Sequence, residues 1–258
     1  MRIVLLGHRD IASLLALHRL VTLLPGHTFT TFYSDGAFAS QKTPVSELDA
    51  LAAYDAELID RWRDGEFGAT PVAALSLDDP RILNAPNSEA GVERLEATSP
   101  DLVISIRYRR ILRDAAIAVP QLGVINIHSG LLPDYRGVMA TFWAMLNGEQ
   151  KIGTTIHWIV DGGIDTGPII DSLPQPLDHQ RSYLANVIGL YAVACERLAS
   201  RISDIASAQI LHSDAQAGAG AYFSMPQQAD VDAFLEAGHR LSQGAETDAI
   251  QGLLRTRV

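Results

Sequence analysis

The sequence has one cysteine and no long apolar run, and both absences limit what the protein can be. Cys195 lies in an apolar stretch and has no second thiol with which to form a disulfide or a metal cage. We expect a buried structural thiol in a reducing cytoplasm. No stretch approaches the roughly 18 apolar residues that span a bilayer, and the first apolar residues are interrupted at Gly7 before a signal-peptide core could form. We therefore expect an untargeted protein with no membrane partner.

Charged side chains are scarce, at 19% of 258 residues, and basic ones are outnumbered. The 30 acidic and 20 basic side chains give a formal net charge of −10 at pH 7. A surface with that excess repels polyphosphates unless a local basic patch overrides it. Nucleic acid is therefore not an expected partner. The 47% apolar content, by contrast, supports a substantial core.

Short apolar runs and helically spaced apolar residues alternate along most of the chain. This alternation predicts an α/β fold with an open, mostly parallel twisted sheet and helices on both faces. We assign residues 1–205 to one catalytic domain and residues 206–258 to a linker and a short C-terminal helical appendage. Strands are expected at 2–6, 27–33, 101–106, 123–128, 154–160 and 168–173, and helices at 11–24, 45–64, 86–98, 138–146 and 181–205.

The most informative segment follows the strand expected at 123–128. Asn126 and His128 are two residues apart, so their side chains project from one face of the sheet if the strand persists to His128. Ligand crevices in open α/β sheets lie at the carboxyl ends of strands, so an amide and an imidazole are placed here for chemistry. The alternative is structural: Asn126 caps the turn and His128 is a satisfied polar residue.

A carboxylate in a second, glycine-containing loop favours the catalytic interpretation. Asp165 lies between Gly162-Gly163-Ile164 and Thr166-Gly167-Pro168, whereas Asp161 fits an ordinary turn residue. A carboxylate, an imidazole and a carboxamide together form an acyl-transfer site without a covalent nucleophile. The amide and a protonated imidazole can hydrogen-bond the oxyanion of a tetrahedral intermediate, while the carboxylate fixes the charge state of the imidazole or moves a proton through water.

These residues resemble the formyltransferase family that uses 10-formyltetrahydrofolate. The family pattern is Asn-x-His, then Leu-Pro-x-x-(Arg/Lys)-Gly, then an aspartate in a glycine-rich loop; here it is carried by Asn126, His128, Leu132-Pro133, Arg136-Gly137 and Asp165. The resemblance covers roughly residues 100–175, and the first hundred residues are compatible with its Rossmann-like fold. It implies that Asn126, His128 and Asp165 are the catalytic trio and that 10-formyltetrahydrofolate is the co-substrate.

The resemblance also implies where the folate binds. The segment from Ser105 to Leu112 would line the pterin pocket, which the family reads mostly through backbone groups. A solvated strand end is the alternative role for the arginines of this segment. The expected folate contacts are Arg107, Tyr108, Ile111, Leu112, Asp161 and Gly163.

Departures from the family pattern bear on the acceptor. Where glycinamide ribonucleotide transformylases carry a phosphate loop, this chain has Gly7-His8-Arg9-Asp10, whose acid disfavours phosphate. Methionyl-tRNA formyltransferases add a basic barrel domain of about a hundred residues, whereas only some fifty follow Ile205 in this acidic protein. Formyltetrahydrofolate hydrolases carry an N-terminal regulatory module, whereas this chain begins with the first expected strand. A small-molecule amine is the acceptor that remains.

Among small-molecule formyltransferases, the segments 136–143 and 164–167 look most like those of specialised metabolism. We favour enzymes that act on hydroxyornithine in siderophore biosynthesis over those that act on nucleotide-linked amino sugars. The expected acceptor contacts are Tyr135, Arg136 and Thr141, while Phe142 and Trp143 fit a core-facing aromatic cluster. A homodimer is compatible with this class.

A rival from another class is a Rossmann-like nucleotide-binding oxidoreductase module in which the trio is structural. It requires three glycines at the start of the first helix, and residues 7–12 supply one. Metal catalysis has little support, because the eight histidines are scattered, with no pair at ligand spacing on one expected helix. We expect no metal site.

Overall fold

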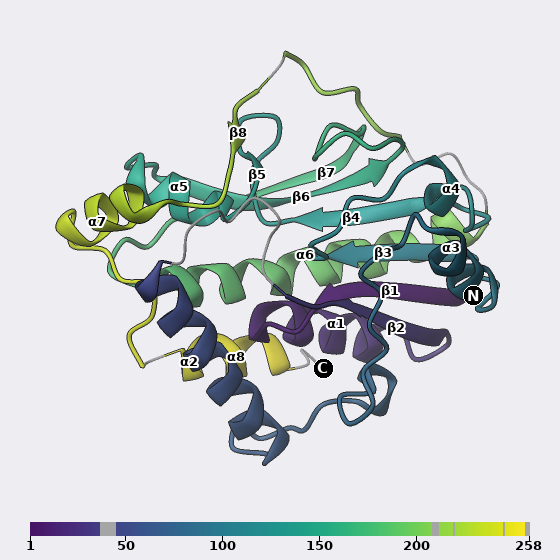
Figure 1. Cartoon of the computed structure of the whole chain (residues 1–258), viewed down its shortest axis with the longest axis horizontal. Helices are drawn as coiled ribbons and strands as arrows, with labels where there is room; N and C mark the ends of the chain where they lie inside the picture. The colour runs from purple at the N-terminus through teal and green to yellow at the C-terminus, as the bar shows by residue number, and fades with distance from the viewer. Residues whose placement is uncertain (37–44, 208–211, 219, 245, 256–258) are drawn as a thin grey trace.

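A six-stranded sheet forms the centre of the computed structural model, which describes residues 1–36, 45–207, 212–218, 220–244 and 246–255 (Figure 1). Its strand order is β2-β1-β3-β4-β6-β7. β1 to β4 run parallel, and β6 is antiparallel to both of its neighbours, so the expected mostly parallel α/β sheet is confirmed. The strands are β1 Arg2–His8, β2 Thr28–Ser34, β3 Leu102–Ile106, β4 Val124–His128, β6 Lys151–Ile159 and β7 Ile169–Pro176.

The helices follow the expected segments, with small shifts at their ends. They are α1 Ile11–Leu23, α2 Ser46–Arg63, α3 Glu89–Glu96, α4 Asp114–Ile117, α5 Ala140–Leu146, α6 Tyr183–Ala206, α7 Gln228–Glu236 and α8 Thr247–Leu254, with a 3-10 turn, η1, at Ala73–Leu75. The sequence analysis missed α4 and η1, which are too short to show a helical period. It also missed a small second sheet, in which β5 (Arg136–Gly137) pairs with β8 (Tyr222–Phe223).

Alternate residues of the central strands enter two separate apolar clusters. Ile3 and Leu5 of β1 pack in the larger cluster with α1 and α6, while Val4 and Leu6 pack in the smaller one with Leu95 of α3. Helices therefore cover both faces of the sheet, as the nearly continuous apolar strands predict. This arrangement leaves the ends of the strands as the place where polar side chains can gather.

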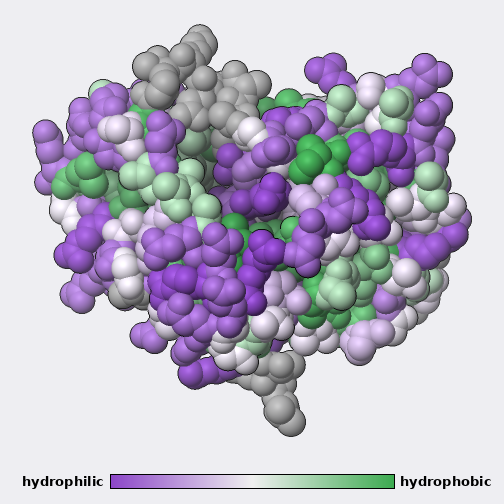
Figure 2. Space-filling model, turned by 60° about the horizontal axis from the view of Figure 1, so that its bottom comes forward, coloured by the Kyte–Doolittle hydropathy of each residue, from purple (hydrophilic) through white to green (hydrophobic). Residues whose placement is uncertain are grey.

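The thiol of Cys195 lies inside the larger cluster, on α6, with no exposed surface. The expected burial of this thiol is therefore confirmed, and burial raises its pKa well above the ordinary value. Hydrophilic side chains dominate the face seen in Figure 2, which is hollowed near its centre. None of the helices in the described residues is long and apolar enough to cross a membrane.

The parallel strands carry their carboxyl ends to one edge of the sheet. Gly7 of β1 is in register with Ile106 of β3, and Ser105 of β3 with Asn126 of β4, so three strand ends meet there. α1 starts at the same edge, where Asp10 caps the helix by accepting a hydrogen bond of 2.8 Å from the Ser13 N–H.

The C-terminal helices lie against the sheet domain. Phe234 of α7 and Ile250 of α8 are fully buried in the larger cluster, and α8 contacts both α1 and α6. The expected boundary at residue 205 stays a prediction. Residues 208–211 and 219 of the expected linker lie outside the described part of the chain.

Buried His18 makes the stability of the fold depend on pH. Burial, with a smaller effect of Arg19, lowers the pKa of His18 to about 4, and its Nδ1 accepts a hydrogen bond from the Val72 N–H at 3.3 Å. An unfolded histidine titrates near pH 6.5, so the stability from neutral His18 is present above that pH and is lost as the pH falls toward 4. We expect His18→Gln, which keeps an acceptor for Val72, to lose less stability than the wild type between pH 7 and pH 4.5. Urea denaturation across this range measures the difference, and equal slopes would contradict the assignment.

Candidate active site

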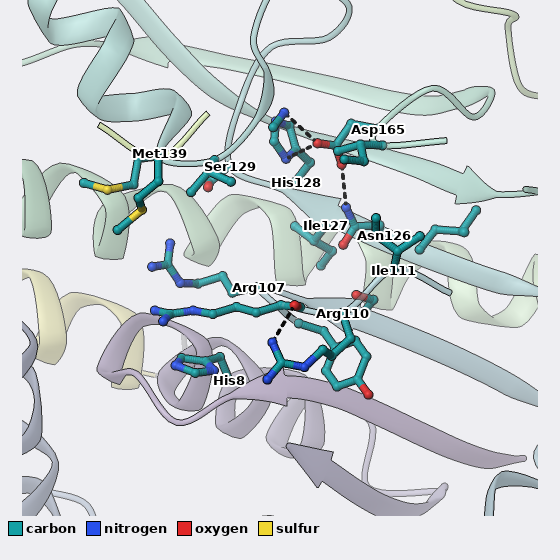
Figure 3. A pocket seen from close by; sticks show the side chains of 18 of the residues that line it. His8, Arg107, Arg110, Ile111, Asn126, Ile127, His128, Ser129, Met139 and Asp165 are labelled. Carbon is teal, nitrogen blue, oxygen red and sulfur yellow. Dashed lines mark hydrogen bonds and ion pairs between the residues drawn. The ribbon is translucent and has the colours of Figure 1, made fainter. Parts of the chain in front are cut away.

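A cavity of about 660 Å³ lies at the carboxyl ends of β1, β3 and β4 (Figure 3). Its walls come from α2, the end of β3, β4, the loop after β6 and the start of α6. Nine residues that the sequence analysis selected line it: Arg107, Tyr108, Ile111, Leu112, Asn126, His128, Asp161, Gly163 and Asp165. These nine residues come from three separate segments, 107–112, 126–128 and 161–165, which the fold brings to one cavity.

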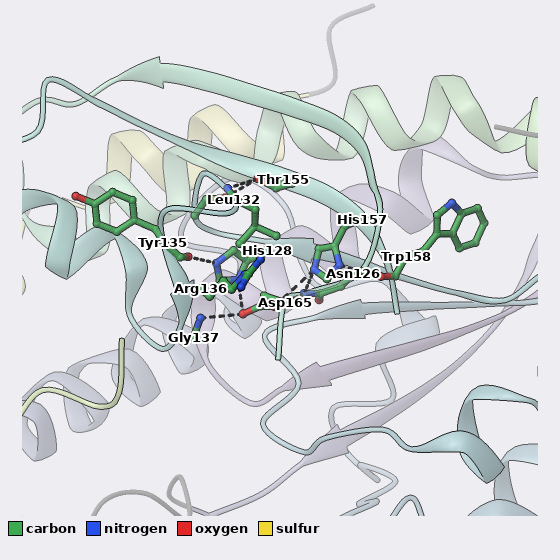
Figure 4. A network of polar contacts seen from close by, with 12 residues as sticks. Asn126, His128, Leu132, Tyr135, Arg136, Gly137, Thr155, His157, Trp158 and Asp165 are labelled. Carbon is green, nitrogen blue, oxygen red and sulfur yellow. Dashed lines mark hydrogen bonds and ion pairs between the residues drawn. The ribbon is translucent and has the colours of Figure 1, made fainter. Parts of the chain in front are cut away.

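The structure brings Asn126, His128 and Asp165 into direct contact (Figure 4). Asn126 and His128 project from the end of β4, and Asp165 reaches them from the loop between β6 and β7. The Asn126 Nδ2 lies 3.3 Å from the Asp165 Oδ1, and the His128 Nδ1 lies 3.5 Å from the Asp165 Oδ2. The side chains of His128 and Asp165 are only 8% and 11% exposed, so little water screens this pair.

The backbone fixes which nitrogen of His128 faces the acid. The His128 Nε2 lies 2.7 Å from the carbonyl oxygen of Tyr135, and a carbonyl only accepts, so Nε2 carries a hydrogen and donates it. The Nδ1 is left on the side of Asp165. A proton on Nδ1 can therefore be held by the carboxylate and passed to a ligand in the cavity.

Asp165 is a carboxylate whose charge is strongly favoured by its surroundings. Burial alone would raise its pKa, but His128, His157 and the Gly137 N–H outweigh burial and lower the pKa of Asp165 to about 2. The Gly137 N–H donates to the Asp165 Oδ2 at 2.9 Å. Asp165 also has a φ of 52°, a left-handed conformation that is uncommon for a residue other than glycine. Such strain is typical of functional positions.

His157 is a member of this network that the sequence analysis missed. It lies on β6 directly opposite Asn126, buried to 2% exposure, with its Nε2 3.5 Å from the Asp165 Oδ1. Its Nδ1 lies 3.0 Å from the Trp158 carbonyl oxygen and so donates to it, which leaves the Nε2 to accept from the Asn126 Nδ2 at 3.1 Å. The antiparallel register of β4 and β6 places His157 here, and no local spacing reports that register.

The hydrogen bonds of Asn126 orient its carboxamide. Both amide hydrogens are used, one by His157 and one by Asp165, so the amide carbonyl oxygen remains for a ligand. The expected donation from this amide to an oxyanion stays a prediction, and it requires one of the two bonds to be exchanged. A carbonyl oxygen in this place can instead accept a hydrogen from an attacking amine and orient its lone pair.

A second group of charged side chains lies across the cavity, below the trio in Figure 3. The Arg107 Nε contacts both carboxylate oxygens of Asp10, at 2.8 and 2.9 Å, and the Arg109 guanidinium lies 3.5 Å from the same acid. Although burial opposes it, these arginines hold the pKa of Asp10 below its ordinary value. Burial and the charge of Asp10 raise the pKa of nearby Asp55 to about 8, and burial lowers that of His8 to about 4.

Four of the residues expected to contact the folate lie after β3, at 107–112, in the cavity wall. Arg107 turns toward Asp10, with a left-handed φ of 57°, and the hydroxyl of Tyr108 donates to the Leu83 carbonyl. The backbone carbonyl of Ile111 accepts from the Asn87 side chain at 2.8 Å. Direct contact of these residues with a folate stays a prediction.

The three expected acceptor contacts lie outside the cavity lining. The hydroxyl of Tyr135 donates to Glu149 at 2.8 Å, Arg136 donates to Gln216, and Thr141 is 2% exposed within α5. Their role in acceptor binding stays a prediction. In the described part of the chain, no group of three His, Cys, Asp or Glu side chains is arranged to hold a metal ion.

Comparison with known proteins places this site in a family. A family model named formyl transferase matches residues 70–183, which contain all three members of the trio. This stretch, which runs from just before η1 to the start of α6, is similar to the formyl transferases. Methionyl-tRNA formyltransferases of Pelobacter propionicus and Roseiflexus sp. are 30% identical over 123 residues and 41% identical over 155 residues. These matches cover 48% and 57% of this chain, but only 38% and 47% of the two relatives, so the chain spans less than half the length of either curated relative.

Solved structures extend the likeness to formyl transferases to the fold of nearly the whole chain. A sugar N-formyltransferase from Shewanella sp. has a TM-score of 0.58 at 19% identity and covers 92% of this chain and 87% of its own. The formyltransferase PseJ from Anoxybacillus kamchatkensis has a TM-score of 0.54 at 19% identity, covering 99% and 100%. Glycinamide ribonucleotide transformylase 1 from Symbiobacterium toebii has a TM-score of 0.56 at 18% identity, covering 84% and 94%. The Rossmann-like formyltransferase fold expected from the sequence is confirmed.

Gly137 should be sensitive to any side chain. Its φ is 96°, and a Cβ here would lie 2.2 Å from the Phe223 carbonyl oxygen. Gly148 also has a positive φ, 71°, but open space around the added Cβ. We expect Gly148→Ala to cost about 1 kcal/mol of unfolding free energy and Gly137→Ala clearly more, because only Gly137 adds a clash to the backbone strain. Denaturant unfolding of both variants checks this; equal losses would mean that the β5 and β8 backbones are not closely apposed.

Proposed function

We propose that this protein transfers the formyl group of 10-formyltetrahydrofolate to the amine of a small molecule. The observation that carries the proposal is the contact of His128, Asp165 and Asn126 in a cavity at the strand ends of a chain that is similar to the formyl transferases. Two neighbours bear on the donor: PseJ was solved with tetrahydrofolate, and the sugar 3N-formyltransferase WlaRD with 5-N-formyltetrahydrofolate.

The chemistry follows from the proton positions. The unprotonated acceptor nitrogen, oriented by the carbonyl oxygen of Asn126, attacks the formyl carbon, and the formyl oxygen becomes an oxyanion. A proton held on the His128 Nδ1 by Asp165 stabilises this oxyanion. The acceptor nitrogen then loses its extra proton through water on the Asp165 side. As the oxyanion returns to a carbonyl, the bond between the formyl carbon and N10 breaks, and N10 takes up a proton in exchange for the one released. Tetrahydrofolate and the N-formyl product leave.

An anionic group of the folate or of the acceptor can bind beside the segment that is expected to line the folate pocket. Arg107 and Arg109 place two guanidinium groups in the cavity wall across from the trio, beside a single low-pKa carboxylate, that of Asp10. A diphosphate or an amino-acid carboxylate has the charge to bind there. The neighbours named as sugar N-formyltransferases favour a nucleotide-linked amino sugar over the hydroxyornithine-type siderophore precursor that the sequence suggested. A cytoplasmic location and a homodimeric state stay predictions.

Substitutions in the trio should separate chemistry from binding. We expect His128→Ala and Asp165→Asn each to lower kcat by about a hundredfold or more, because each group acts on charge that develops during transfer. Binding of 5-formyltetrahydrofolate, measured by calorimetry without ATP, should change little. Near-normal turnover of either variant at saturating substrate would refute the mechanism. Binding of ATP or a nicotinamide dinucleotide, without binding of any folate, would favour the oxidoreductase rival.

The acceptor class can be decided by pH-dependent assays. Because the pKa of Asp165 is about 2, its ionisation does not limit the rate near neutral pH, and protonation of a basic acceptor amine should do so instead. We expect the protein to turn over a nucleotide-linked amino sugar, and the rate to fall at low pH as the amine of the sugar becomes protonated. The release of tetrahydrofolate reports the rate. Hydroxyornithine and ornithine are assayed beside the amino sugar. Turnover of hydroxyornithine alone would restore the siderophore assignment. Its rate should fall less at acid pH, because its nitrogen is less basic.

A further inference from the structure

The C-terminal segment (residues 212–218 and 220–225) crosses the catalytic loop. Asp214 exchanges two backbone hydrogen bonds with Ile169 at the start of β7, of 2.8 and 2.9 Å. Further on, the N–H of Arg136 donates to the Ala221 carbonyl at 3.0 Å, and that of Val138 donates to the Phe223 carbonyl at 2.9 Å. The C-terminal segment is therefore bonded on both sides of the Asp165 loop, once to β7 and once to β5.

Gln216 lies between these two attachments and fills its hydrogen-bonding capacity at the catalytic loop. Its Oε1 accepts from the Nε and Nη2 of Arg136, at 3.2 and 2.8 Å. Its Nε2 donates to the backbone carbonyl oxygens of Asp165 and Gly167, both at 2.8 Å. A guanidinium only donates and a carbonyl only accepts, so the amide can make all four bonds in one orientation only.

Two of the three partners of Gln216 bear directly on the Asp165 carboxylate. One is the carbonyl of Asp165 itself. The φ of Asp165, 52°, has a free-energy cost that contacts with its surroundings must offset. The other is Arg136, the residue before Gly137, whose N–H donates to the Asp165 Oδ2. The side chain thus braces the loop that carries the acid and the strand that supplies its hydrogen bond.

We propose that Gln216 is a positioning residue for Asp165, and that the C-terminal segment completes the catalytic site through it. Gln216 holds the left-handed loop so that the carboxylate stays within reach of His128. It does not line the cavity and acts through Asp165 rather than on the substrates. This inference rests on the proposed function, because the measured quantity is formyl transfer.

Two substitutions separate positioning from simple packing. Gln216→Met keeps the length of the side chain and removes all four hydrogen bonds. Gln216→Glu keeps acceptors for Arg136, with an added charge, but sets carboxylate oxygens against the two carbonyls in place of the donors. We expect both variants to lower kcat by about tenfold or more, with Glu at least as impaired as Met, because a misplaced catalytic group costs rate rather than binding. The dissociation constant for 5-formyltetrahydrofolate should stay within about twofold of the wild type.

The matched control is Gln175→Met on β7. The Gln175 Nε2 also donates to a backbone carbonyl, that of Leu190 at 3.3 Å, but away from the trio. We expect this variant to keep the wild-type kcat. A lower kcat in the Gln216 variants alone would then show that the loss is specific to position 216 and is not the general effect of removing a side-chain amide.

Each result decides the inference. A Gln216→Glu variant with wild-type kcat would show that the contact with Arg136 is sufficient, and would overturn it. Wild-type kcat in Gln216→Met, or loss of folate binding together with activity, would also overturn it, the latter because the role would then be structural. A wild-type protein that binds folate analogues but transfers no formyl group to any acceptor would instead count against the proposed function, since position 216 would not have been changed.

Discussion

The buried carboxylate of Asp165 is the constraint on which the rest of the site depends. Removing a charge from water is costly, and here the cost is offset by His128, the amide of Asn126 and the N–H of Gly137. The first two have fixed attachments of their own: His128 to the carbonyl of Tyr135, and Asn126 to His157, which donates to the carbonyl of Trp158. The acid is thus ionised and oriented before any substrate arrives, which is what stabilising a developing charge requires.

The reversal of strand direction at β6 makes this arrangement possible. β6 lies beside β4 in antiparallel register, which sets His157 opposite Asn126. β6 ends opposite Val124, at the start of β4, and the loop after β6 turns back so that Asp165 reaches Asn126 and His128. Two polar residues of β4 therefore meet one residue of β6 and one of the loop that follows it.

The part of the chain after α6 is tied to this region more closely than its composition indicates. Its Ala-, Gly- and Gln-rich sequence resembles a linker, yet its backbone pairs with β5 and β7, and its helices bury Phe234 and Ile250 in the main core. Backbone hydrogen bonds need no particular side chains, so composition carries little information about such pairing.

The sequence by itself determined the strands, the longer helices and the members of the trio, because apolar periodicity and short motifs are local properties. It indicated Asn126 and His128 because strand ends of a parallel sheet share an edge, and Asp165 through the motif of its loop; all three line one cavity. Only the tertiary structure decided the partners of these residues: His157 through strand register, Arg107 and Arg109 with Asp10 across β1 and β3, and Gln216 through the return of the C-terminal segment. Those contacts join residues from 31 positions apart, for Asn126 and His157, to 99, for Asp10 and Arg109, and no local pattern encodes a pairing at that separation.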